Sequence, residues 1–315
     1  MVLVCTNARE SGQGRRRRTS LTIGLAATLF PAPLLAQGAP APATSAVPSA
    51  APASVILNPK RITFDRTGKS AVVNVASAGG AGAFDIELAD RVMLPDGQIV
   101  AATAPEAAAQ LPLLKSAKDY MLVTPRRIRV AANVGQVIRL RASATANLAP
   151  GEYRTHLTVT GIPPADTGLT AEQAAGQKEG QLSFRINSVL SVAIPVILRV
   201  GPIDVRAAFE KTSLGYEVIS PDGRAAPART AVLSLDLVRV GANSLFGDIE
   251  VRGSKKGEEP IGIVRGIGVY PEIGRRTVRI LLARAPAPGE RLEIQFRDND
   301  TSPGAILSKA SLAAP

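Results

Sequence analysis

Short runs in which apolar and polar residues alternate recur along most of this chain. In residues 137–142 (VIRLRA), Ile138, Leu140 and Ala142 fall on one side of an extended strand and the two arginines fall on the other. Antiparallel strands with one buried and one solvated face have this period of two, whereas strands that are covered on both faces are apolar throughout. The alternation therefore predicts an all-β fold in which antiparallel sheets pack face to face.

Clusters of glycine, proline and aspartate mark the turns between these runs and so delimit the expected strands. The first group of expected strands covers residues 61–64, 70–76, 84–92, 120–130, 136–143, 152–160 and 182–200. The second group covers residues 204–209, 214–219, 231–238, 249–251, 261–270, 277–282 and 291–296, and the tail 301–315 is either a last strand or an irregular end. The alanine-rich segments 104–118 and 170–177 are expected to form helices inserted into this β framework.

The order of segments predicts an exported protein with two domains. Residues 1–36 contain four consecutive arginines, a short apolar run and a small residue at the end, which is the order of a secretory signal peptide. The paired arginines leave a twin-arginine export route open beside the general secretory one. Residues 37–53 are almost entirely alanine, proline, serine, glycine and threonine, and we expect a flexible linker there. The remaining length suits two cores, which we place at residues 54–200 and 201–315.

Removal of the leader changes the charge and the cysteine content. Residues 1–36 carry five arginines and one glutamate, so the formal charge falls from +11 to +7. Cys5, the only cysteine, leaves with the leader, and the mature chain can form neither a disulfide nor a cysteine metal site. No apolar stretch after residue 35 is long enough for a membrane-spanning helix, and we expect a soluble periplasmic protein.

The candidate catalytic groups are few. His156 is the only histidine, and alternation within residues 153–159 places its side chain opposite the apolar face, toward water. Asp298 and Asp300 form a carboxylate pair after a strand, where turn residues are common. With no second histidine and no thiol, we expect no enzyme activity, no metal, no cofactor and no small-molecule substrate.

Two glycine clusters and the basic charge have ordinary explanations. Residues 79–82 (GGAG) follow a strand but precede another strand instead of the helix that a dinucleotide site requires, and residues 262–268 have the wrong glycine spacing. We interpret both as turns or bulges. The chain has no tryptophan and few other aromatic residues to stack on bases, so we expect no nucleic-acid partner.

Residues 182–200 (LSFRINSVLSVAIPVILRV) are the segment that most suggests an activity. Every even position is apolar except Ser188, and a continuous strand of this length would extend about 60 Å, far beyond a usual strand. One sandwich cannot cover such a strand, so part of it would lie at an edge and pair with another chain. The alternative is two strands, one for each domain, joined at Pro195, because proline breaks a ladder.

Several motifs resemble the PapD-like chaperones of chaperone-usher pilus systems. Residues 54–64 (SVILNPKRITF) resemble the first strand of that family, and the resemblance continues at residues 123–130, 135–140, 148–154 and 162–164. It covers roughly residues 54–200. After residue 200 only residues 243–248 (NSLFGD) are similar, to divergent members of the family.

The resemblance implies two immunoglobulin-like domains arranged as an L and a role in fimbrial biogenesis. In this family the last strand of the first domain completes a pilin subunit, and a basic residue in the cleft holds the subunit's C-terminal carboxylate. Arg61 matches that basic residue. The residues that match the donor strand are Phe184, Ile186, Leu190 and Val192, with Ser188 as a weak member.

One position departs from the family pattern. Pro195 stands where the family has a second, lysine anchor, so Arg61 acts alone or is helped by Arg185 or Arg199. The expected partners are pilin-like subunits and an outer-membrane usher, and self-association through the donor strand stays open. The alternative hypothesis is a non-catalytic structural or surface-display sandwich of the cell envelope.

Overall fold

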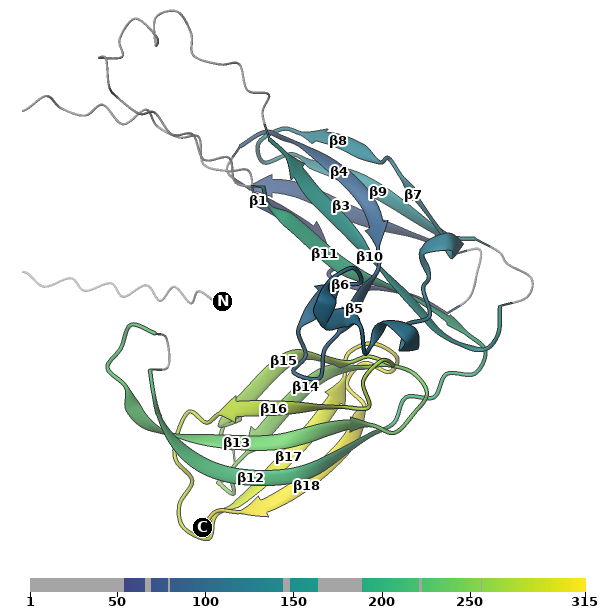
Figure 1. Cartoon of the computed structure of the whole chain (residues 1–315). Helices are drawn as coiled ribbons and strands as arrows, with labels where there is room; N and C mark the ends of the chain where they lie inside the picture. Colours follow the sequence, from purple (N-terminus) through teal and green to yellow (C-terminus); the bar gives the residue numbers. More distant parts are fainter. Residues whose placement is uncertain are drawn as a thin grey trace, which may run out of the picture. The chain divides into compact units, whose positions relative to one another are not determined.

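The computed structural model describes residues 54–65, 69–78, 80–143, 148–163, 189–220, 223–255 and 257–315 (Figure 1). The described residues all belong to one compact unit. The described chain is all β, with two sandwiches that follow one another along the sequence. The predicted fold class is therefore confirmed. Nothing is described for the predicted leader, the linker or the predicted helix at residues 170–177.

The first sandwich consists of a four-stranded sheet packed on a five-stranded sheet. In the first sheet the order is β1 (Ser54–Asn58), β3 (Ser70–Ala78), β9 (Gly135–Ala142) and β7 (Met121–Thr124). In the second sheet the order is β2 (Ile62–Phe64), β11 (Ser191–Val200), β10 (Gly151–Ile162), β4 (Gly82–Ala89) and β8 (Arg127–Val130). All neighbours are antiparallel except β2 and β11, which pair in parallel. The chain from β1 to β2 thus crosses from one sheet to the other.

The second sandwich has one three-stranded and one four-stranded sheet. The order is β12 (Ala207–Ile219), β13 (Ala228–Arg239) and β16 (Arg275–Leu281) in the first sheet. It is β15 (Gly262–Val269), β14 (Leu245–Arg252), β17 (Arg291–Asp298) and β18 (Ile306–Ala313) in the second. The tail after residue 300 therefore contains a last strand. The two strands expected at residues 204–219 are one strand, β12, with an irregularity between Glu210 and Ser213.

In each sandwich, the apolar side chains of the alternating strands point inward from both sheets and form the core. Ile138 and Leu140 of β9 are completely buried, as the pattern of residues 137–142 predicted, and they face Leu157 and Val159 of β10 in the first core. Leu235, Ile249 and Phe296 belong to the second core. Burial of a side chain of this size stabilises by about 1.5 to 3 kcal/mol, so these two clusters contribute most of the stability of a chain without a disulfide.

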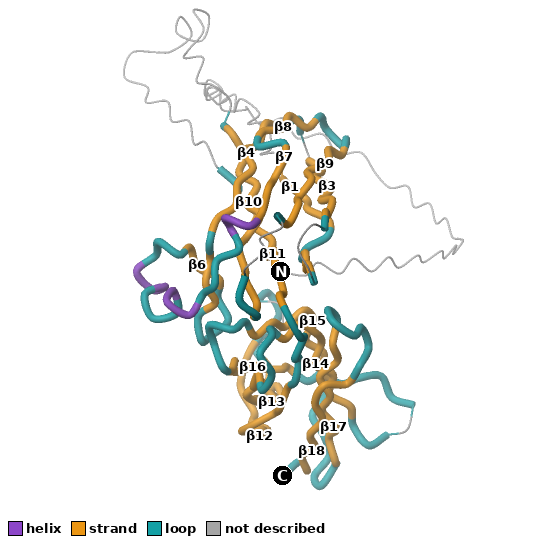
Figure 2. Tube along the Cα trace, turned by 90° about the vertical axis from the view of Figure 1, so that its right-hand side faces the viewer, coloured by secondary structure: helices purple, strands orange, loops and turns teal. Residues whose placement is uncertain are grey.

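The segment between β4 and β7 differs most from the prediction. It forms the short hairpin of β5 (Arg91–Met93) and β6 (Ile99–Ala101), followed by three single 3-10 turns, η1 (Pro105–Ala107), η2 (Leu111–Leu113) and η3 (Lys118–Tyr120) (Figure 2). The continuous helix expected at residues 104–118 is wrong. Pro112 lacks the N–H that would bond to Ala108 in a continuous α-helix, so only the separate 3-10 turn η2 forms around it.

This segment also connects the two cores. Met93 of β5 is buried in the second core, together with Ile197 of β11, although both strands precede the second sandwich in the sequence. The backbone N–H of Met93 donates to Glu272 Oε1 at 2.9 Å. Further along, Arg154 exchanges backbone hydrogen bonds with Lys115 and Ala117, so this segment extends the sheet beyond the end of β4.

One of the two glycine clusters has the role expected of a turn or bulge. The second lies in β15, where the register against β14 shifts and Gly266 has a positive φ of 66°. Of the first cluster, Gly79 lies outside the described residues and Gly82 begins β4.

Candidate strand-donation site

Strand β11 has one edge that is only partly paired. Along one edge it pairs with β10 over its whole length, from Ser191 to Val200. Along the other edge, β2 pairs only with residues 196–198. Within the described part of the chain, no strand pairs with the outer edge of residues 191–195. Among the strands that the structure describes, that half of β11 is therefore an open sheet edge, to which another strand can add.

The direction of the backbone groups follows from one hydrogen bond. Gly161 N donates to Leu190 O at 2.9 Å, in the same register as the β10–β11 ladder. Because hydrogen-bonded and non-hydrogen-bonded pairs alternate in antiparallel sheets, the even residues of β11 bond to β10 and the odd residues point to the other edge. Ser191 and Ala193 therefore present both backbone groups at the open edge, whereas Pro195 presents only its carbonyl. The ladder passes through Pro195, so the predicted alternative of two strands joined there is wrong.

The apolar residues of β11 continue toward this open half. Ile194, Val196 and Leu198 are buried in the first core, and Val192 is partly buried against it. Val189 and Leu190 precede the strand, and their exposed fractions are 54% and 41%. The described strand begins at Ser191, so the prediction of a continuous strand is wrong for residues 189 and 190. Phe184, Arg185, Ile186 and Ser188 lie outside the described residues.

Arg61, the predicted carboxylate anchor, lies immediately before β2 and is held by the chain itself. Its Nη2 is 3.0 Å from Asp300 Oδ2 and donates to Ser244 Oγ at 3.0 Å, and its guanidinium lies 4.7 Å from the centre of the Phe246 ring. The side chain is only 9% exposed. Arg61 is therefore part of a buried ion pair.

Arg199, a second predicted anchor, shares the same carboxylate. Its Nη2 lies 2.8 Å from Asp300 Oδ2, and its Nε donates to Glu152 Oε2 at 3.0 Å. Burial alone would raise the pKa of Asp300, but the charges of Arg61 and Arg199 outweigh it and hold the pKa below its usual value. Asp300, predicted to be only a turn residue, is the centre of this ion pair. Asp298 does have the predicted role, since it accepts backbone hydrogen bonds from residues 300–302.

A second buried ion pair lies beside the first. Arg154 pairs with Glu272, and its guanidinium lies 4.0 Å from the centre of the Tyr270 ring. Arg154 is 1% exposed, and this burial lowers its pKa to about 10. The sequence prediction missed both residues, because an arginine in an alternating strand gives no sign that its face is covered.

His156 is buried, so the prediction of a solvated histidine is wrong. It is 3% exposed, and Arg154 Nη1 lies 3.4 Å from its Nε2. The polar face of β10 is buried from Glu152 to Thr158, together with its apolar face. Burial and, second, the charge of Arg154 lower the pKa of His156 to about 2, so the ring is neutral at any physiological pH.

No family model matches this chain, and no curated protein matches its sequence. Among solved structures, it is similar to the Pseudomonas aeruginosa CupB2 chaperone, with 12% identity, a TM-score of 0.40 and coverage of 82% of this chain and 100% of that chain. It is also similar to the Escherichia coli chaperone DraB, with 13% identity, a TM-score of 0.38 and coverage of 84% and 96%. A third similar structure is the CsuC–CsuE chaperone-tip adhesion subunit pre-assembly complex of Acinetobacter baumannii, with 12% identity, a TM-score of 0.36 and coverage of 82% and 97%.

All three of these structures contain a chaperone, and the third belongs to chaperone-usher pili. TM-scores of this size do not establish a function, so the function must be argued from the residues of this chain.

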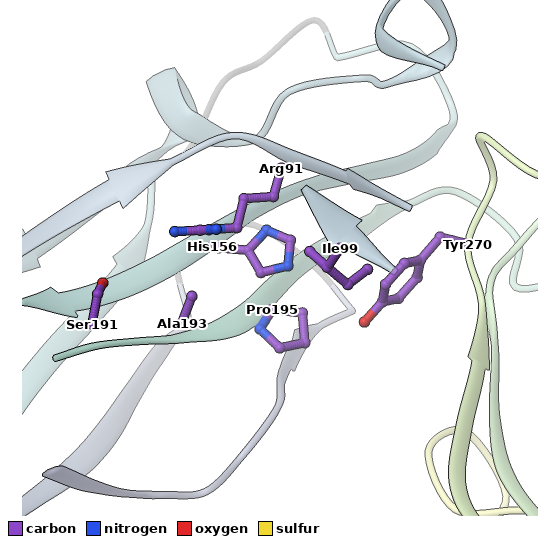
Figure 3. A pocket seen from close by; sticks show the side chains of 7 residues that line it. All are labelled: Arg91, Ile99, His156, Ser191, Ala193, Pro195 and Tyr270. Atoms are coloured by element: carbon purple, nitrogen blue, oxygen red, sulfur yellow. The ribbon is translucent and has the colours of Figure 1, made fainter. Parts of the chain in front are cut away.

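A cavity of about 270 Å³ lies along the open half of β11 (Figure 3). The odd residues of the strand, Ser191, Ala193 and Pro195, line one wall. The other lining residues are Arg91, Ile99, His156 and Tyr270. The cavity therefore combines an open strand edge with a guanidinium and a neutral imidazole.

The described residues contain no group of three or more histidine, cysteine or acidic side chains that could hold a metal ion. Among them, too, no helix is long and apolar enough to cross a membrane.

Proposed function

We propose that this chain is a periplasmic chaperone that binds pilin-like subunits by adding the open half of β11 to an incomplete subunit sheet. The observation that carries the proposal is the edge of residues 191–195, which presents backbone groups of Ser191 and Ala193 without a partner strand in the described structure. Exposed edges of this kind promote aggregation unless they serve to pair with another chain.

The side chains beside this edge supply a second source of affinity. Leu190 is 41% exposed and Val192 is half-buried, and burial of each in a partner would stabilise the complex by about 1 to 3 kcal/mol. Main-chain hydrogen bonds along the edge give affinity that does not depend on sequence, and alternate side chains give specificity. The proposed activity is therefore the binding of a partner strand.

The proposal includes the residues before and after the described strand. We place the export signal at residues 1–36, the linker at 37–53 and the chaperone domain at 54–200. Phe184 and Ile186 would extend the donated face toward the amino end of the strand. Delivery of the bound subunit to an outer-membrane usher completes the proposed role.

The test is recovery of a partner from the periplasm. The tagged mature chain is expressed in its own cells, and the chains that purify with it are identified by mass spectrometry. We expect a small secreted protein to purify with the tagged chain in an equal molar amount. Leu190→Asp should reduce its recovery by about 10-fold or more, because a carboxylate would have to be buried in the subunit core.

Val218→Asp is the matched control, since Val218 lies on β12 and is 72% exposed. Neither substitution should change the thermal unfolding midpoint, because neither side chain is buried. Equal partner recovery with both variants would exclude strand donation through β11. Finding the chain permanently within isolated fibres would instead support the surface-display alternative.

A further inference from the structure

We propose that a second copy of this chain pairs with the outer edge of β12 and forms a twofold-symmetric dimer through the second sandwich. This inference goes beyond the proposed function, because strand donation uses β11 of the first sandwich and this contact uses β12. β12 is an edge strand of its three-stranded sheet and pairs with β13 along one side. Among the strands that the structure describes, none pairs with its other side.

The backbone groups at this open side belong to the even residues of β12. Leu282 N donates to Ala231 O at 2.9 Å, in the register of the β13–β16 ladder, so Ala231 bonds toward β16 and Val232 bonds toward β12. Val232 pairs with Gly215, so Gly215 in turn bonds toward β13. The neighbours of Gly215 along the strand direct their N–H and carbonyl groups to the open side, and they are Leu214, Tyr216 and Val218.

Protection of this edge against pairing is confined to one end of the strand. Lys211, with a positive φ of 50°, lies in the irregularity between Glu210 and Ser213, and bulges and lysines on edge strands hinder pairing with other chains. After this irregularity, the register against β13 is regular from Ser213 to Ile219. This regular stretch contains no proline and no lysine, so its open side is free to accept another strand.

The side chains of the regular stretch are unusually bare for apolar groups. Val218 is 72% exposed, the highest value among the exposed large apolar residues that the structure describes, and Tyr216 is 36% exposed. β16 pairs with β13 only from Val232 onward, so the end of the β12–β13 hairpin reaches past the third strand of its sheet (Figure 1). A partner strand would cover these side chains and also satisfy the backbone groups beside them.

The regular stretch is complementary to a second copy of itself. Its midpoint is Tyr216, and an antiparallel pairing centred there places Tyr216 opposite its own copy and Leu214 opposite Val218. All of these residues direct their backbone groups to the open side, so each facing pair exchanges two hydrogen bonds. Glu217 is the one charged residue of the stretch and lies opposite Gly215, so no like charges face each other.

Other symmetric registers use less of the edge. A pairing centred on Leu214 runs into the irregularity at Lys211, and one centred on Val218 runs past the end of the strand at Ile219. The contact is small, so we expect a dissociation constant on the order of 10 to 100 µM. At about 1 µM, where thermal unfolding of variants is compared, the chain is then a monomer.

Sedimentation velocity of the mature chain tests the dimer. The average mass should rise toward that of a dimer as the concentration increases from about 1 to about 300 µM. Val218→Pro removes an N–H that points to the open side, and it removes no bond to β13. It should raise the dissociation constant by about 10-fold or more, because a twofold contact loses this bond twice. Val218→Thr keeps the N–H and the branched shape, so this matched control should leave the constant nearly unchanged.

A thiol at the centre of the contact tests the register. The chain has no cysteine after residues 1–36 are removed, so Tyr216→Cys introduces the only one. Hydrogen-bonded residues that face each other in antiparallel strands have Cα atoms about 5.5 Å apart, which a disulfide can span, so mild oxidation should give a covalent dimer. Ser213→Cys is the control and should stay uncrosslinked, because its two copies would lie about 20 Å apart along the strands.

Four results would overturn the proposal. They are a monomer at every concentration, a dimer that Val218→Pro leaves intact, a dimer that is lost instead in Leu190→Asp and so depends on β11, and equal crosslinking of Ser213→Cys and Tyr216→Cys. Recovery of the periplasmic partner should be the same with Val218→Pro as with the unmodified chain. Failure of the dimer and failure of strand donation are therefore distinguished by separate measurements.

Discussion

The single histidine of this chain allows a sharp test of its buried β10 face. His156 is the only histidine in the sequence, and in the structure it is 3% exposed beside Arg154. Its pKa falls from 6.5 to about 2 because burial and the neighbouring guanidinium both disfavour the imidazolium. Any histidine titration near neutral pH therefore reports on this one position.

The sign of the effect follows from proton binding. Below pH 6.5 the unfolded chain takes up a proton on His156, whereas the folded chain stays neutral until the pH approaches 2. Stability is therefore lost as the pH falls, with a slope of about 1.4 kcal/mol per pH unit well below the unfolded pKa. Between about pH 7.5 and about pH 5.5 the free energy of unfolding should decrease by about 1.4 kcal/mol through this group alone.

Two measurements check this value. Urea unfolding at the two pH values gives the loss of stability, and the variant His156→Gln, which cannot titrate, should lack this contribution. The proton NMR signal of the imidazole should also keep its chemical shift across the same range. A solvated histidine would titrate near its ordinary pKa and give no slope. A signal that moves with a midpoint near 6.5, or equal pH slopes in both proteins, would contradict the buried site.

Two further predictions concern the second sandwich and its contact with the first. Glu272→Gln leaves Arg154 buried without its carboxylate, so it should lower the free energy of unfolding, measured with urea, by about 3 to 5 kcal/mol. The control is Glu217→Gln, which removes an exposed ion pair and should change this free energy by less than about 1 kcal/mol. Equal effects of the two substitutions would mean that Glu272 is not buried as described. Gly247→Ala should lower the thermal unfolding midpoint, with a destabilisation of about 1 to 3 kcal/mol, because its Cβ would overlap the backbone carbonyl oxygen of Arg297. Gly215→Ala, where the added atom meets nothing, is the control, and equal midpoints in the two variants would refute the argument.

The sequence predicted the strands well because their cause is local. The alternation in residues 137–142 places Ile138, Leu140 and Ala142 in the core, and all three are completely buried. The turn residues predict the ends of most strands to within a few positions of the observed ends. The helix expected at residues 104–118 does not form, because Pro112 interrupts the helical hydrogen bonds that the alanine content favours.

The site was harder to predict because its burial comes from contacts distant in sequence. Alternation correctly separated the two faces of β10, but it could not show that Tyr270 and Glu272 lie beside the polar face more than 100 residues later. The family resemblance indicates Arg61, but no pattern in the sequence indicates that Asp300 pairs with it.

The distribution of charge around β11 explains how one chain could both hold its two sandwiches in contact and keep a binding site open. Arg61, Arg154 and Arg199 form ion pairs with carboxylates of their own chain, and in each case at least one partner comes from the opposite sandwich. Such pairs are costly to break, so they make this contact specific but leave no charge for a ligand. Arg91 lies outside this cluster, on the hairpin whose Met93 belongs to the second core. The cavity beside the open edge and the contact between the sandwiches thus share neighbouring residues of β5, since Arg91 lines the cavity and Met93 is in the second core.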